Sequence, residues 1–330
     1  ALLLVVLAPS GLVHADPAAP TDYRTEVVSV SPQIPGLVVS IEGGDSFVRL
    51  QAPEGAEVIV FGYAGEPYLR IAEDGIVYQN ILSAATYENE NRYGGAEVPA
   101  FVDFRAPPDW ERIGDGGVWS WHDHRSHWMD DEPLIGLDPG ESLPPQLIPV
   151  TVDGQQVGII VETTLFDGPS PWPAVLGALV GLQLVLLGWY VGPATATLTT
   201  LVVSLGALVA GAGQFLSLPA ETDPRLVWWA MPSVAVLCGV VAIATYGRSE
   251  WLVRVLLAVA GAQLLVWGFI RRDTLTKPIL PTDIAFWFDR AATAAALVGG
   301  AAITALALWS LVAPPKPAPA SDDPAPAPAT

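Results

Sequence analysis

The second half of the chain is dominated by long apolar runs. Five stretches of 19–24 residues contain few or no charged side chains: 173–191, 195–218, 226–246, 252–270 and 291–312. A bilayer core about 30 Å thick needs about 20 apolar residues in a helix. Seven tryptophans lie close to the predicted ends of these runs, as is typical of membrane–water interfaces. The pattern therefore predicts a bundle of five transmembrane helices.

The first half has a different pattern, with short runs rich in Val, Ile and Phe between turn signals such as Pro35-Gly36 and Gly43-Gly44. These runs are 25–30, 37–41, 46–50, 57–61, 68–71, 76–79 and 157–163. Their close spacing predicts an antiparallel, sandwich-like β domain. Residues 83–148 show only weak alternation, so we expect them to form long loops packed over the sheets.

Composition divides the chain at the same place. Overall, 51% of the residues are hydrophobic and 15% are charged, which is too few charges for an ordinary soluble protein. Residues 16–170 contain 26 acidic residues and seven arginines, a net charge of −19, whereas residues 171–330 contain eight of each sign. Nucleic acid is excluded as a partner, because phosphate binding needs clustered Lys and Arg. The lipid bilayer and cations are the expected partners.

The beginning of the sequence resembles the end of a secretory signal. An apolar stretch over residues 1–13 leads to Val13-His14-Ala15, a small-residue cleavage pattern that precedes the polar Asp16. An uncleaved N-terminal anchor is the alternative. Either reading places the acidic domain outside the cytoplasm of a multi-pass plasma-membrane protein, and five spans then place the C-terminus inside. The expected organisation is a signal remnant (1–15), an acidic extracytoplasmic β-rich domain (16–170), a five-helix transmembrane domain (171–313) and a disordered Pro/Ala tail (314–330).

Candidate chemistry is concentrated in one short segment. The three histidines that follow residue 15, His122, His124 and His127, lie within six residues of one another, and Met129 follows two positions later. In an extended segment His122 and His124 point to the same face, and a turn at Arg125-Ser126 would let His127 join them. Imidazole is the commonest transition-metal ligand, and a thioether favours copper over zinc. We therefore predict a metal site formed by His122, His124, His127, Met129 and Asp123, with copper as the expected ion and zinc as the second choice.

Two other interpretations of this segment remain open. His–Asp and Arg–Asp pairs between the aromatic residues Trp119, Trp121 and Trp128 could hold a loop in place without a metal. A catalytic histidine acting without a metal is a third reading. The segment has no nearby Ser or Cys nucleophile motif, no phosphate loop and no HExxH, so an enzymatic role has little support in the sequence.

Several stretches together resemble a family of actinobacterial membrane proteins. They are the segment beginning TDYRTEVVSVSP, the segment GYAGEPYLRI, the string WHDHRSHWM and the C-terminal spans. The HDHR-S/T-HWM string is the most specific of these, and the similarity covers most of the chain after residue 15. The family has no assigned activity. The resemblance therefore implies an exported strand-rich domain on a membrane anchor and assigns no catalytic residue.

Two functions follow as alternatives. The first is a membrane-anchored surface protein whose exported domain binds a transition metal through the histidine cluster. The second is a non-catalytic interaction or assembly protein, with a membrane-protein partner, in which the His/Asp/Arg loop is structural.

Overall fold

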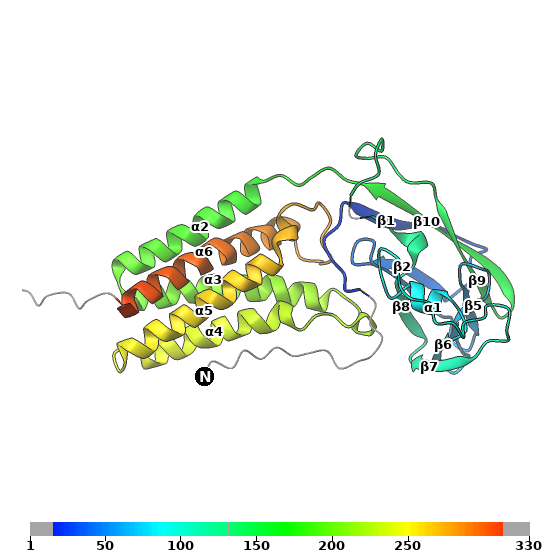
Figure 1. The fold of residues 1–330 in the computed structure, drawn as a ribbon, viewed down its shortest axis with the longest axis horizontal. Coiled ribbons are helices and arrows are strands. Elements are labelled where there is room, and N and C mark those ends of the chain that lie inside the picture. Colours follow the sequence, from blue (N-terminus) through cyan, green and yellow to red (C-terminus); the bar gives the residue numbers. More distant parts are fainter. Residues whose placement is uncertain (1–15, 131, 313–330) are drawn as a thin grey trace, which may run out of the picture.

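A computed structural model describes residues 16–130 and 132–312. It contains a strand-rich domain followed by five long helices, so the predicted fold class is confirmed. Figure 1 shows the two parts side by side, with the helices roughly parallel to one another and one end of the bundle facing the strands. The predicted signal remnant and the Pro/Ala tail lie outside the described residues.

The strand-rich domain contains ten strands in two antiparallel sheets. Seven strands form one sheet in the order β1-β10-β9-β4-β5-β6-β7, and three form the other in the order β2-β3-β8. Their bounds are β1 (Tyr23–Ser31), β2 (Val38–Glu42), β3 (Phe47–Gln51), β4 (Val58–Phe61), β5 (Pro67–Ile71), β6 (Val77–Asn80), β7 (Trp110–Gly114), β8 (Val118–Trp121), β9 (Gln146–Val152) and β10 (Gln155–Leu165). A short helix, α1 (Ala85–Glu88), follows β6.

One hydrophobic core joins the two sheets. Along β10, alternate residues from Val157 to Leu165 are buried, which is the period-two pattern of a strand with one covered face. Val48, Leu50 and Trp121 of the smaller sheet belong to the same buried cluster as Ile159 of the larger one. Burial of this apolar surface is the main favourable contribution to the stability of the domain.

The expectation that residues 83–148 form only loops was wrong in part. The segment contains β7 and β8, and β9 begins at Gln146. β7 lies at the edge of its sheet and has no buried side chain, so it lacks an alternating pattern. β9 contains Pro149. A proline in the sequence argues against a central strand, because proline cannot donate a backbone hydrogen bond to a neighbouring strand. In the structure β4 pairs only with residues 150–152 of β9, so Pro149 lies outside that ladder.

Five helices in the second part are long and apolar enough to cross a membrane: α2 (Trp172–Val191), α3 (Pro193–Leu216), α4 (Val227–Thr245), α5 (Glu250–Ile270) and α6 (Phe286–Val312). Short 3₁₀ turns, η2 (Ala220–Thr222) and η3 (Arg272–Leu275), lie in the two loops that face the strand-rich domain. The predicted spans agree closely with these helices, except that α6 begins five residues before the predicted 291. Its first turns include Asp289 and Arg290, which are buried.

Glycine allows the helices to pack closely. A Cβ atom on Gly177 of α2 would lie 2.2 Å from the carbonyl oxygen of Ala291 of α6, and one on Gly181 would lie 2.8 Å from the Cα of Ala295. Such contacts leave no room for a larger residue. They are typical of membrane helices, where close packing drives helix association in place of the hydrophobic effect.

A buried ion pair joins three helices at the end of the bundle that faces the strands. Arg271, at the end of α5, donates to both carboxylate oxygens of Asp289 of α6, at 2.6 and 2.8 Å. The same guanidinium donates to Gln214 of α3 and lies 4.8 Å from the ring centre of Trp267. In the sequence Arg271 directly follows the apolar run 252–270. Its burial follows from the carboxylate, amide and aromatic ring that surround it.

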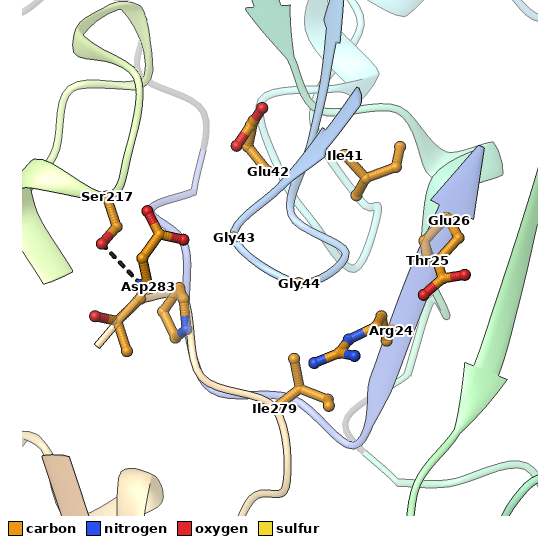
Figure 2. A pocket seen from close by; sticks show the side chains of 12 residues that line it. Arg24, Thr25, Glu26, Ile41, Glu42, Gly43, Gly44, Ser217, Ile279 and Asp283 are labelled. Carbon is orange, nitrogen blue, oxygen red and sulfur yellow. Dashed lines mark hydrogen bonds between the residues drawn. The ribbon is translucent and has the colours of Figure 1, made fainter. Parts of the chain in front are cut away.

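The two parts of the chain are connected by direct contacts. Thr21 and Ile279 exchange both backbone hydrogen bonds, at 3.0 and 3.1 Å, and Lys277 pairs with Asp22 at 2.5 Å. On the other loop, Glu221 pairs with Arg49 of β3 at 2.5 Å. Figure 2 shows this junction, where Ile279 lies beside the turn between β2 and β3.

Candidate functional site

The histidine segment folds as a strand followed by a tight turn. β8 ends at Trp121, and Asp123 caps the 3₁₀ turn η1 (His124–Ser126) by accepting a hydrogen bond from the backbone N–H of Arg125 at 3.1 Å. The turn also contains a bond from the Ser126 N–H to the Asp123 carbonyl, at 2.8 Å. The predicted turn at Arg125-Ser126 is therefore present, and it brings His127 back toward the other two histidines.

The three imidazole rings form a row with His127 in the middle. Its ring centre lies 5.9 Å from that of His122 and 5.5 Å from that of His124, and both pairs meet edge to face. His122 and His127 are buried, whereas His124 is partly exposed and stacks on Tyr63. Phe47 covers His122 on another side, with ring centres 4.6 Å apart.

Each imidazole uses one ring nitrogen to bond a backbone carbonyl oxygen. The partners are Asp16 for Nε2 of His122 (2.7 Å), Asn91 for Nε2 of His124 (3.0 Å) and Trp128 for Nδ1 of His127 (3.0 Å). Because a carbonyl can only accept, the bonded nitrogen carries the proton and the other nitrogen of a neutral ring is an unprotonated acceptor. In His122 and His127 that second nitrogen is buried and has no hydrogen-bond partner among the described residues.

Burial keeps both of these rings neutral. It lowers the pKa of His122 to about 4 and that of His127 to about 3, and the nearby Arg92 guanidinium acts in the same direction on both. At neutral pH each ring therefore presents a bare nitrogen lone pair inside the domain. An unprotonated ring nitrogen is a requirement for metal ligation.

The other two predicted ligands lie differently. The Asp123 carboxylate is fully buried and accepts from Nε and Nη2 of Arg125, both at 2.7 Å, and from Nε1 of Trp121 at 3.0 Å. It thus holds the turn together. Met129 is partly buried, and its methyl group packs against Gly94, 3.4 Å from the position a Cβ there would take. Among the described residues, no group of three or more His, Cys, Asp or Glu side chains is placed to hold a metal ion together.

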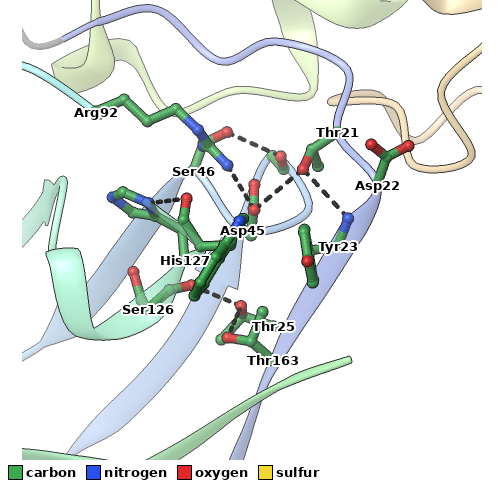
Figure 3. Close-up of polar contacts among 12 residues, drawn as sticks. Thr21, Asp22, Tyr23, Thr25, Asp45, Ser46, Arg92, Ser126, His127 and Thr163 are labelled. Carbon is green, nitrogen blue, oxygen red and sulfur yellow. Dashed lines mark hydrogen bonds and ion pairs between the residues drawn. The ribbon is translucent and has the colours of Figure 1, made fainter. Parts of the chain in front are cut away.

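A buried ion pair that the sequence did not indicate lies close to the rings. Arg92 donates to Asp45 at 2.5 Å, and Thr21 donates to the same carboxylate oxygen at 3.2 Å. Figure 3 shows Asp45 between these two partners, with His127 on the side of Arg92. The side chain of Asp16 accepts from the backbone N–H of Arg92 at 3.0 Å. Of these charged groups Arg92 acts most strongly on both rings, and its guanidinium opposes a further positive charge there.

Comparison of the chain with protein-family models, with curated proteins and with solved structures finds no match in any of the three. The site is therefore interpreted from its own geometry.

The lowered pKa values predict an acid-sensitive domain. Histidine has a pKa of about 6.5 in an unfolded chain, so the stability that comes from keeping these rings neutral is fully present above that pH. It is lost as the pH falls toward 4 and 3, by at most about 1.4 kcal/mol per histidine and pH unit. Thermal unfolding of the metal-free full chain, followed by circular dichroism of the strands at pH 7 and pH 5, measures this loss. His127→Gln should reduce it, and an unchanged slope in the variant would show that the titrating groups lie elsewhere.

Proposed function

We propose that the chain is a membrane-anchored surface protein whose strand-rich domain lies outside the cytoplasm and binds copper, as Cu(I), through His122 and His127. The observation that carries this proposal is the pair of buried, bare ring nitrogens, Nδ1 of His122 and Nε2 of His127. Metal-ligating histidines usually donate their other ring N–H to a carboxylate or a backbone carbonyl, which fixes the ring and its tautomer. Both rings have such a partner here.

The separation of the two rings fits a shared ion. Metal–nitrogen bonds are about 2.0–2.1 Å long, so two nitrogens that ligate one ion lie at most twice that distance apart. The centres of the two rings lie behind these nitrogens and are therefore somewhat further apart. The observed 5.9 Å between ring centres is compatible with this arrangement. Cu(I) accepts two nearly opposed ligands, whereas structural zinc requires four in a tetrahedron. A buried site with two imidazoles therefore favours Cu(I) over zinc.

Two other predicted ligands lie in the same part of the domain. The ring centre of His124 is 5.5 Å from that of His127, and Met129 packs against Gly94 in the loop that contains Asn91 and Arg92. A thioether is a soft donor that prefers Cu(I).

A structural role of the segment is the second candidate. It is favoured by the Asp123–Arg125 pair and by the three imidazole–carbonyl bonds, which hold the turn and the loop around Asn91 without any metal. In this reading the domain serves assembly with a membrane-protein partner.

A competition titration separates the two candidates. The full chain in detergent is titrated with Cu(I) against a chromophoric chelator. We expect one Cu(I) per chain. Loss of a residue that only hydrogen-bonds a metal ligand weakens binding roughly 10–100-fold, so His122→Gln and His127→Gln, which each remove a ligand, should weaken binding by more than this. His124→Gln is the matched control and should have a smaller effect. If the parent chain binds no Cu(I), the structural role is the correct one.

The proposed orientation is tested by cysteine labelling. Arg248 follows α4 at the end of the bundle remote from the strands, and Arg272 follows α5 at the end near them. With Cys238 replaced by alanine, Arg272→Cys should react with an impermeant thiol reagent on intact cells, and Arg248→Cys should react only after the membrane is opened. The reverse pattern would place the strand-rich domain in the cytoplasm.

A further inference from the structure

A polar cavity lies at the junction of the two parts, away from the histidines. Its volume is about 330 Å³, and it is open to solvent between β1, the turn that joins β2 and β3, and the loops that follow α3 and precede α6. Four charged side chains line it: Arg24, Glu26, Glu42 and Asp283. Figure 2 shows Arg24 reaching from β1 toward Ile279, with Asp283 coming from the loop before α6.

The charged side chains in this cavity do not form ion pairs with one another. Among the residues that the structure describes, the Arg24 guanidinium makes no hydrogen bond or ion pair, and its only recorded partner is the ring of Phe166, 5.3 Å away. The carboxylates of Glu26 and Asp283 have no ion-pair partner within the same range, and Glu42 accepts only from Ser40. An unpaired guanidinium therefore shares one hollow with three carboxylates without pairing with any of them.

The position of the cavity relative to the helix ends indicates its depth in the membrane. Ser217, which lines it, follows the last residue of α3, and Asp283 lies three residues before the first residue of α6. Trp287, in the first turn of α6, is 63% exposed, as expected for a side chain at a membrane interface. The headgroup layers extend about 5–8 Å beyond each side of a hydrocarbon core about 30 Å thick. A cavity just beyond the helix ends is therefore at headgroup depth.

We propose that this cavity binds the headgroup of a phospholipid whose phosphate carries a primary ammonium, such as phosphatidylethanolamine. Arg24 would bind the phosphate and the Asp283 carboxylate would accept from the ammonium, while Glu26 and Glu42 add negative charge to the cavity wall. The net charge of −2 from these four side chains disfavours a purely anionic headgroup.

The chemistry of the walls also distinguishes between ammonium headgroups. A quaternary ammonium has no N–H to donate and is recognised by aromatic faces, and none of the described residues that line this cavity is aromatic. An ethanolamine ammonium donates three hydrogen bonds and fits carboxylates better. An apolar groove between α2, α3 and α6 begins at the same end of the bundle, with Trp172 and Trp287 at its outer end. This groove gives the acyl chains of a lipid an apolar surface, which favours the lipid over a free phosphoester.

Native mass spectrometry of the delipidated full chain tests the proposal with short-chain phosphatidylethanolamine, phosphatidylcholine and phosphatidylglycerol. We expect the ethanolamine lipid to bind at least about 10-fold more tightly than the other two, since charge-assisted hydrogen bonds distinguish it. Arg24→Gln and Asp283→Asn should each remove this preference. Arg112→Gln, which changes an exposed arginine of β7, should retain it. Circular dichroism of each variant without lipid checks that the fold is intact.

Equal binding of the three lipids, or an unchanged preference in a folded Arg24→Gln variant, would overturn the proposal. A competition experiment with free phosphoethanolamine distinguishes binding of a lipid from binding of a free phosphoester. Competition with the lipid would show that the headgroup alone carries binding. No competition, with the lipid preference intact, would show that the acyl chains contribute as well. None of these results depends on copper.

Discussion

Replacing Arg271 by leucine is expected to destabilise the helical bundle by about 3–5 kcal/mol. The substitution leaves the fully buried Asp289 carboxylate without the guanidinium that donates to both of its oxygens. It also leaves Gln214 of α3 without its donor. An uncompensated buried charge costs far more than a lost surface pair, because neither water nor another cation replaces the partner.

The neighbouring arginine provides the control. Arg272 is exposed, with 57% of its side chain accessible, so Arg272→Leu should change stability by less than about 0.5 kcal/mol. Thermal unfolding in detergent compares the two variants. The double variant Arg271→Leu, Asp289→Asn should recover a large part of the loss, because it removes both charges. Equal effects of Arg271→Leu and Arg272→Leu would contradict the role of the buried pair.

Arg92→Leu should have an effect of similar size on the strand-rich domain, about 3–5 kcal/mol at neutral pH. Burial already raises the pKa of Asp45, and the Arg92 guanidinium opposes this rise. Without Arg92 the pKa rises further, and a group whose pKa is raised by folding loses stability as the pH increases through that value. The destabilisation should therefore be greater at pH 8 than at pH 5.

The exposed Arg112, which pairs only with the exposed Asp115, is the matched control for this variant. Arg112→Leu should leave unfolding by urea nearly unchanged, and Asp45→Asn combined with Arg92→Leu should restore stability and remove the additional destabilisation at pH 8 relative to pH 5. A loss in Arg92→Leu that is independent of pH would show that packing of the arginine stem, rather than the Asp45 charge, is responsible.

The outline of the fold could be predicted from the sequence because its signals are local. Apolar runs about as long as a bilayer is thick define α2 to α5 almost to the residue, and alternation defines strands such as β10. The edge strand β7 could not be predicted, since it has no buried side chain to produce a pattern. α6 begins earlier than expected because Asp289 is accommodated by Arg271, 18 positions away.

The candidate site could be located but not assembled from the sequence. The density of histidines between residues 122 and 127 indicated the segment, and the turn that returns His127 was expected. The groups that surround the rings were not expected: the Asp16 carbonyl bonds His122 across 106 positions of the chain, and Arg92 pairs with Asp45 across 47. No local pattern encodes such contacts. Asp123 was expected as a ligand because a carboxylate can bind a metal or orient an imidazole, whereas its carboxylate is engaged by Arg125 and Trp121.

Copper binding by His122 and His127 is tested most directly by X-ray absorption at the copper edge on the full chain loaded with one equivalent of Cu(I). We expect bound copper with imidazole nitrogen neighbours at about 2 Å and the multiple-scattering pattern of at least two rings. His127→Gln should lose this pattern, whereas Arg112→Gln should keep it. Copper that does not bind to the parent chain, or that binds without imidazole scattering, would contradict the assignment of His122 and His127 as the metal site.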